Sequence, residues 1–183
     1  MMDARAVING GIMKLQNGKR IEVDKWDLII AHPPRTYLSN VATRHHSTRT
    51  SPINCINART HSRILAAEFF MVFVEANCER VAIENPVGIM NTCYRKPDQI
   101  IEPYQFAEDC NDKENYVTKR TCLWLKGLQP LKTNNLDKPD NSKLFGILSS
   151  GKTRTWTDTF SRDASVRSKT FSGMARAMAE QWG

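Results

Sequence analysis

The stretch WDLIIAHPPRTYLSN, from Trp26 to Asn40, predicts a short strand that ends at a rigid loop. Residues Trp26–Ala31 form an apolar run with β-branched side chains, and Pro33-Pro34 ends the run. In an open α/β sheet, ligands bind at the loops that follow the carboxyl ends of the strands. We therefore expect Arg35, directly after the prolines, to face a substrate or partner, although an ordinary surface turn also fits these residues.

A helix and a second strand of the same kind follow this loop. Residues Arg80–Ile83 form an apolar run that ends at Glu84-Asn85-Pro86. Between the two runs, Ser62–Asn77 carries apolar side chains at helical spacing, namely Leu65, Phe69, Val72, Phe73 and Ala76. A strand, a crossover helix and a second strand form a right-handed parallel unit, whose strand ends share one edge of the sheet. The sequence therefore predicts that Glu84 and Arg35 are neighbours.

These patterns predict an α/β fold of the three-layer sandwich class, with a mostly parallel sheet, in a single domain over residues 1–183. Residues 11–23 are expected to form a β-hairpin insertion with a two-residue turn at Asn17-Gly18. Residues Thr118–Leu128 have the character of a further strand. The C-terminal segment FSGMARAMAEQW predicts a helix that packs through Met174, Ala177, Met178 and Trp182.

The charge of the chain favours polyanionic partners. Lys and Arg number 26 against 19 Asp and Glu, which gives a formal net charge of +7. The loop at residues 43–62 is rich in basic and hydroxyl side chains that can bind phosphates, or it is an ordinary solvated loop. No apolar run approaches the roughly 18 residues needed to span a bilayer, and the layout of a signal peptide is missing. We therefore expect a cytoplasmic protein with DNA as a partner and no membrane association.

The cysteines and histidines predict no metal site. The five cysteines form an odd set without a C-x-x-C pair, which favours reduced thiols over a disulfide framework. His45 and His46 are adjacent, so they point in different directions on a helix or strand, and no other ligand lies at a suitable spacing.

Four motifs together resemble a known family. The segments AHPPRTYLSN, AIENPVG, TKRTCLWLKGL and RSKTFSGMARAMAEQW resemble, in this order and spacing, the DNA cytosine methyltransferases that act at carbon 5. More narrowly, they are similar to small methyltransferase-like proteins encoded by phages and prophages. The resemblance covers Trp26 to Gly183 almost without a break. It implies a truncated Rossmann-like methyltransferase fold, S-adenosylmethionine as cofactor, and a cytosine flipped out of DNA as substrate.

The resemblance also assigns roles to catalytic positions. Enzymes of this family add a cysteine thiolate to carbon 6 of cytosine, which activates carbon 5 toward the methyl group of S-adenosylmethionine. The thiolate position, directly after Pro-Pro, is occupied here by Arg35, and a protonated guanidinium cannot attack carbon 6. Glu84 matches the glutamate that holds the cytosine ring, and Asn85 is expected to support its loop. The sequence therefore predicts that methyl transfer is lost.

The cofactor side of the family pattern is incomplete. The family has a first strand and a Gly-containing loop that bind the methionine end of the cofactor, whereas Gly10-Gly11 lacks the G-x-G spacing and is interpreted as a turn. Asp3 and Pro33 are the candidate cofactor residues, and S-adenosylmethionine binding is expected to be weak or absent. The candidate substrate-binding residues are Pro34, Ser39, Arg44, Arg49, Arg59, Arg63 and Arg120.

Several functions follow from this combination. The leading hypothesis is a methyltransferase-like protein of phage or prophage type that is catalytically inactive and acts through DNA binding in the bacterial host, as a decoy or anti-restriction factor. The alternatives are an active or mutationally inactivated S-adenosylmethionine-dependent DNA cytosine methyltransferase, and one half of a split enzyme. A further alternative is a phage anti-defence protein that binds a host or phage protein.

Overall fold

The chain forms two compact units that are interleaved in sequence. The computed structural model describes residues 4–15, 17–40, 49, 51–155 and 170–183. The first unit consists of Met1–Gln99 and Thr121–Pro130, and the second of Ile100–Arg120 and Leu131–Gly183. Across the described residues, no helix is long and apolar enough to cross a bilayer.

A mixed sheet forms the centre of the first unit. Its strands β3 (Ile29–Ala31), β4 (Val81–Pro86) and β6 (Thr121–Lys126) are neighbours in this order. β3 pairs with β4 in parallel, so the predicted strand, helix and strand unit is confirmed. β4 pairs with β6 in the antiparallel direction, from Val81 opposite Lys126 to Pro86 opposite Thr121.

The predicted mostly parallel three-layer sandwich, and the truncated Rossmann-like fold with it, is wrong. The protein is instead a small α/β protein with two sheets, one of them mixed. Parallel neighbours need a crossover of a dozen or more residues, which is usually a helix. Between β4 and β6 the chain forms only α3 (Met90–Cys93) and η3 (Pro103–Phe106), each of 4 residues, besides the short strand β5 (Gln99–Ile101). Without a long crossover helix, β6 returns beside β4 in the opposite direction.

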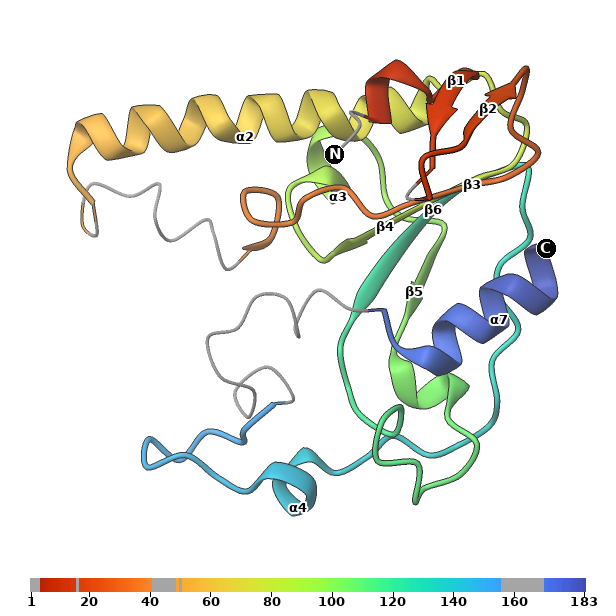
Figure 1. Cartoon of the computed structure of the whole chain (residues 1–183). Helices are drawn as coiled ribbons and strands as arrows, with labels where there is room; N and C mark the ends of the chain where they lie inside the picture. The colour runs from red at the N-terminus through yellow and green to blue at the C-terminus, as the bar shows by residue number, and fades with distance from the viewer. Residues whose placement is uncertain (1–3, 16, 41–48, 50, 156–169) are drawn as a thin grey trace. The chain divides into compact units, whose positions relative to one another are not determined.

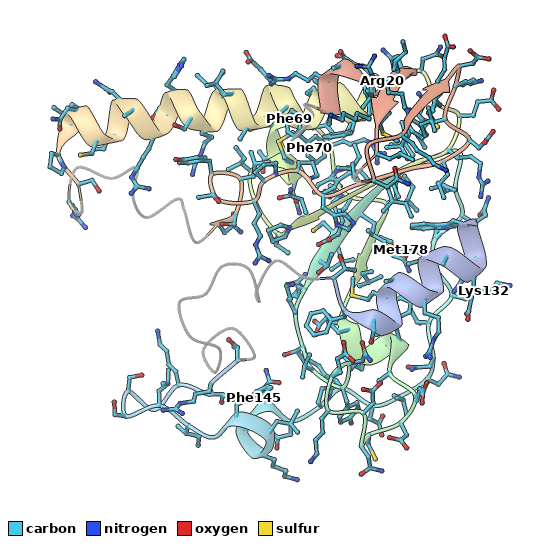
Figure 2. All side chains as sticks on the ribbon, viewed as in Figure 1. Arg20, Phe69, Phe70, Lys132, Phe145 and Met178 are labelled. Carbon is cyan, nitrogen blue, oxygen red and sulfur yellow. The ribbon has the colours of Figure 1, made fainter. Side chains whose placement is uncertain are left out.

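The C-terminal part of helix α2 (Ile53–Val74) packs against one face of the sheet, while its N-terminal half projects beyond the strands, as Figure 1 shows. Its buried residues are Phe70 and Phe73, and the Phe70 ring meets the Trp124 ring edge-on with centroids 5.1 Å apart. Figure 2 shows Phe70 on the side of α2 that faces the strands. The rest of this core comes from Ala31, Leu38, Cys78, Val81, Ile83, Met90 and Cys122.

The beginning of α2 corrects the predicted basic loop. The helix starts at Ile53 and not at Ser62, so residues 53–62 are helical. Pro52 precedes the first turn, where a missing backbone N–H costs no helical hydrogen bond. The first turns of α2 show little apolar periodicity. They extend a helix that is already stabilised by the packing of its C-terminal part.

The N-terminal hairpin is confirmed as an antiparallel pair. β1 (Gly11–Lys14) pairs with β2 (Arg20–Val23), and η1 (Ala4–Ala6) precedes it. The turn is longer than the predicted two residues, because the Leu15 amide donates to the Lys19 carbonyl at 2.7 Å. Gly18 has a φ of 83° within this turn, a conformation that glycine adopts at no steric cost.

The second unit is built around the C-terminal helix α7 (Ser172–Trp182). The predicted apolar face is confirmed, since Met174, Ala177, Met178 and Trp182 are buried. Buried Asn115 accepts a hydrogen bond from the Gly173 amide at 2.9 Å and so caps the first turn. The unit also contains η3 and the short helix α4 (Asn141–Phe145).

Candidate functional site

The candidate site lies where β3 ends beside the last residues of β4. The parallel register places Ala31 opposite Ile83, so the next residues lie side by side, with His32 just beyond β3 and Glu84 still within β4. The Nδ1 atom of His32 lies 2.5 Å from Oε2 of Glu84. The histidine side chain is 43% exposed and the glutamate side chain 17%. The structure therefore gives Glu84 a close partner that the sequence analysis missed, since it named only Arg35 as the neighbour.

Asn85 fixes the loop from the next position of β4. Its side chain is 2% exposed, and its Nδ2 donates to the carbonyl of Pro33 at 3.0 Å. Its Oδ1 is buried and has no hydrogen-bond partner within the described parts of the chain. Pro33 is buried whereas Pro34 is exposed, so the loop turns outward between the two prolines.

Arg35 begins a turn that packs against the end of β4. The Arg35 carbonyl accepts from the amides of Leu38 and Ser39 at 3.2 and 3.1 Å. Ser39 forms a bridge with Gly88, and the Ile89 amide donates to the Leu38 carbonyl at 2.9 Å. These bonds join the loop after β3 to the loop after β4, with the half-buried Arg35 at its start.

The loops after β3 and β4 approach so closely that only glycine fits at position 88. A Cβ atom at position 88 would collide with the carbonyl of Leu38. The backbone conformation of Gly88 is an ordinary one, so the constraint is steric contact between the two loops. We call residues His32–Ser39 together with Glu84–Gly88 the strand-end site.

Arg63 anchors the same loop from α2. Its Nε donates to the Tyr37 carbonyl at 3.1 Å, and its Nη2 is buried. Burial lowers the pKa of the Arg63 guanidinium, although an arginine stays charged at any ordinary pH. The structure thus places this predicted phosphate ligand beneath the loop, against the protein backbone.

The other predicted site residues are scattered. Arg49 is exposed, Arg59 is half-buried on α2, and Arg120 is exposed in the second unit. Asp3, Arg44, His45 and His46 lie outside the described residues. The structure therefore brings together Pro33, Pro34, Arg35, Ser39, Glu84 and Asn85, and adds His32, Gly88 and Arg63 to them.

Comparisons of the chain with models of protein families, with curated proteins and with solved structures find no match. The chemistry of the strand-end site therefore follows from its own side chains. The site offers the Glu84 carboxylate as an acceptor, the His32 imidazole as a donor or acceptor, and the Arg35 guanidinium as a cation. Such a set can hydrogen-bond a planar polar group or an anion, but it supplies no activated nucleophile.

The glycines interpreted as a turn, Gly10 and Gly11, belong to the hairpin region. Gly10 and Gly11 have φ values of 97° and 116°, and a Cβ at Gly10 would collide with the carbonyls of Val23 and Asp24. These glycines therefore lie at the open end of the hairpin, where the chain passes close to the end of β2. The cysteine paired in register with Asn85 is Cys122, which is 0% exposed. We derive no methyl-transfer step from this arrangement.

Proposed function

We propose that this chain binds DNA through the strand-end site, as a catalytically inactive relative of the phage and prophage DNA cytosine-C5 methyltransferase-like proteins. One observation carries the proposal: Glu84 is held 2.5 Å from His32, in the same strand-end site as the turn that begins at Arg35. The family resemblance gives the glutamate the role of contacting a base, and gives the position of Arg35 to the nucleophile.

The side chains of the site suit nucleic-acid recognition. Base edges present fixed patterns of donors and acceptors, which a carboxylate and an imidazole can match. A guanidinium binds phosphate or a guanine edge through two parallel hydrogen bonds. The formal net charge of +7 favours association of the chain with a polyanion.

The same residues argue against catalysis. Arg35 stands where the resemblance expects a thiolate, and a guanidinium is not a nucleophile. Cys55, Cys93 and Cys110 are exposed but lie in α2, in α3 and in the second unit, while Cys78 and Cys122 are buried. The proposed activity is therefore binding alone.

Fluorescence anisotropy with labelled DNA tests the proposal. Binding is expected to be weak, largely independent of sequence, and strongly weakened by salt, because basic side chains displace condensed counterions. Arg35→Ala should lower the affinity for a mismatched duplex more than for an intact duplex, since an unpaired base is easier to extrude. Arg20→Ala removes the same charge from the exposed start of β2 and should affect the two duplexes equally.

Two results would overturn the proposal. If the chain does not bind DNA even at low salt, DNA is not its partner and a protein partner becomes the leading hypothesis. If the chain incorporates labelled methyl groups from S-adenosylmethionine into DNA above background, it is an enzyme and the inactive assignment is wrong.

A further inference from the structure

A cavity of about 220 Å³ lies along the first half of β4, from Val81 to Ile83, within the first unit. Its lining includes Val81, the first residue of β4, and Lys126, the residue paired with it on β6. Phe73 of α2 and Trp124 of β6 supply aromatic walls and are both buried. The cavity is therefore a mainly apolar, half-open pocket, and none of its lining residues belongs to the strand-end site.

The polar groups around this cavity leave one positive charge uncompensated. Arg95 also lines it, but the Arg95 guanidinium is paired with Asp98 at 2.7 Å. Lys126 is exposed, and its ammonium donates to the neutral carbonyl of Ala76 at 3.0 Å. Within the described residues no carboxylate lines the cavity or forms an ion pair with Lys126.

We propose that this cavity binds a small aromatic carboxylate, with its ring between Phe73 and Trp124 and its carboxylate at Lys126. Size supports one ring, because an apolar cavity of about 150 Å³ already accepts benzene and the additional volume suits a short acidic arm. Buried aromatic walls favour edge-on or offset contacts with a ligand ring. The Lys126 ammonium, which forms no ion pair within the described parts of the chain, selects an anion over a neutral molecule of the same shape.

Nuclear magnetic resonance on the full chain tests this site directly. The indole N–H of Trp124 donates to the Arg95 carbonyl at 2.9 Å, so its signal reports on the cavity wall. Trp124→Phe assigns that signal among those of the 4 tryptophans. Titration with phenylacetate should shift it in a saturable way, and the neutral isostere phenylacetamide should bind more weakly.

Two variants and one control separate the contribution of the Lys126 charge from that of the cavity volume. Lys126→Gln should weaken phenylacetate binding about two- to fivefold, the range of a partly exposed ion pair. Lys152→Gln, at an exposed position of the second unit, should leave the affinity unchanged. Val74→Phe adds volume at a half-buried wall position at the end of α2, and should abolish binding while the chain stays folded by circular dichroism.

The results distinguish a failure of this ligand-binding proposal from a failure of the DNA-binding proposal. The Trp124 signal reports phenylacetate without any DNA present, and Val74→Phe should leave DNA affinity unchanged because Val74 lies away from the strand-end site. The inference is overturned if phenylacetate up to its solubility limit produces no saturable shift of the Trp124 signal. It is also overturned if phenylacetamide, or the Lys126→Gln variant, gives the same affinity as phenylacetate with the unmodified chain.

Discussion

The Asn85 side chain, buried on β4, donates to the carbonyl of Pro33 at 3.0 Å across a separation of 52 residues in sequence. Through this bond β4 determines where the loop after β3 leaves the sheet. The rest of the strand-end site is arranged around it, because His32 and Arg35 flank the two prolines.

Asn85→Ala should destabilise the first unit. The substitution leaves the Pro33 carbonyl without its partner in a buried position, which costs about 1 to 3 kcal/mol of unfolding free energy. Urea denaturation measures the change. Asn57→Ala, at an exposed position of α2, is the matched control and should change the unfolding free energy by less than about 0.5 kcal/mol. Equal effects of the two substitutions would contradict a special role for Asn85.

Gly88→Ala should destabilise the protein more than the addition of a single methyl group usually does. The new methyl group collides with the Leu38 carbonyl, so the two loops must separate, at a cost of about 1 to 3 kcal/mol. Gly151→Ala meets open space, but its φ of 78° disfavours alanine by about 1 kcal/mol. Thermal unfolding compares the two variants. A smaller loss for Gly88→Ala than for Gly151→Ala would show that the loops are not tightly joined.

Replacing Arg63 and replacing Arg49 by a neutral residue should have different effects, the first on stability and the second on the salt dependence of DNA binding. Arg63→Gln removes the hydrogen bond to the Tyr37 carbonyl and should lower the unfolding free energy by about 1 kcal/mol. Arg49→Gln, at an exposed position, should instead flatten the slope of log affinity for DNA against log salt by roughly one unit. Anisotropy over a salt series and urea denaturation of both variants decide the matter. A full unit of slope lost in Arg63→Gln, with stability unchanged, would place Arg63 at the DNA after all.

Asp98 makes the first unit sensitive to acid. Partial burial alone raises the pKa of Asp98, but hydrogen bonds from Arg95 and from the Leu125 amide outweigh it and hold the pKa below the usual 3.8. A carboxylate with a depressed folded-state pKa stabilises the fold above the unfolded pKa, and this stability is lost as the pH falls. Asp98→Asn should therefore be destabilising at neutral pH, with a deficit that shrinks below about pH 4.

Denaturation at several pH values measures this deficit. Asp24→Asn, at an exposed position at the end of the hairpin, controls for the loss of one negative charge. A deficit for Asp98→Asn that is constant across the acid range would mean that its cause is packing and not ionisation.

Local sequence patterns predicted the elements of the first unit better than their arrangement. Two apolar runs that end at prolines indicated the parallel strands, and apolar periodicity indicated the packed half of α2. The direction of β6 could not be predicted, because a buried strand has the same residue pattern in either direction. Direction depends on the connection, and residues 87–120 form no long crossover helix.

The candidate site was predicted only in part for a related reason. Both His32 and Arg35 flank the prolines, and the sequence does not show which of them turns toward Glu84. The parallel register decides it, since His32 and Glu84 directly follow the opposed residues Ala31 and Ile83. The role of Arg63 was missed because it depends on a tertiary contact: the loop after β3 packs against α2, which brings the Tyr37 carbonyl to the Arg63 guanidinium.

The interleaving of the two units has a consequence for synthesis on the ribosome. β6 belongs to the first unit but follows residues 100–120 of the second in the chain. A nascent chain that ends before Thr121 therefore contains β3, α2 and β4 but leaves one edge of β4 without the six residues that pair with it. Unpaired strand edges invite association with other chains. The first unit can finish folding only after part of the second has been translated, so neither unit can be expressed as one uninterrupted segment of the sequence.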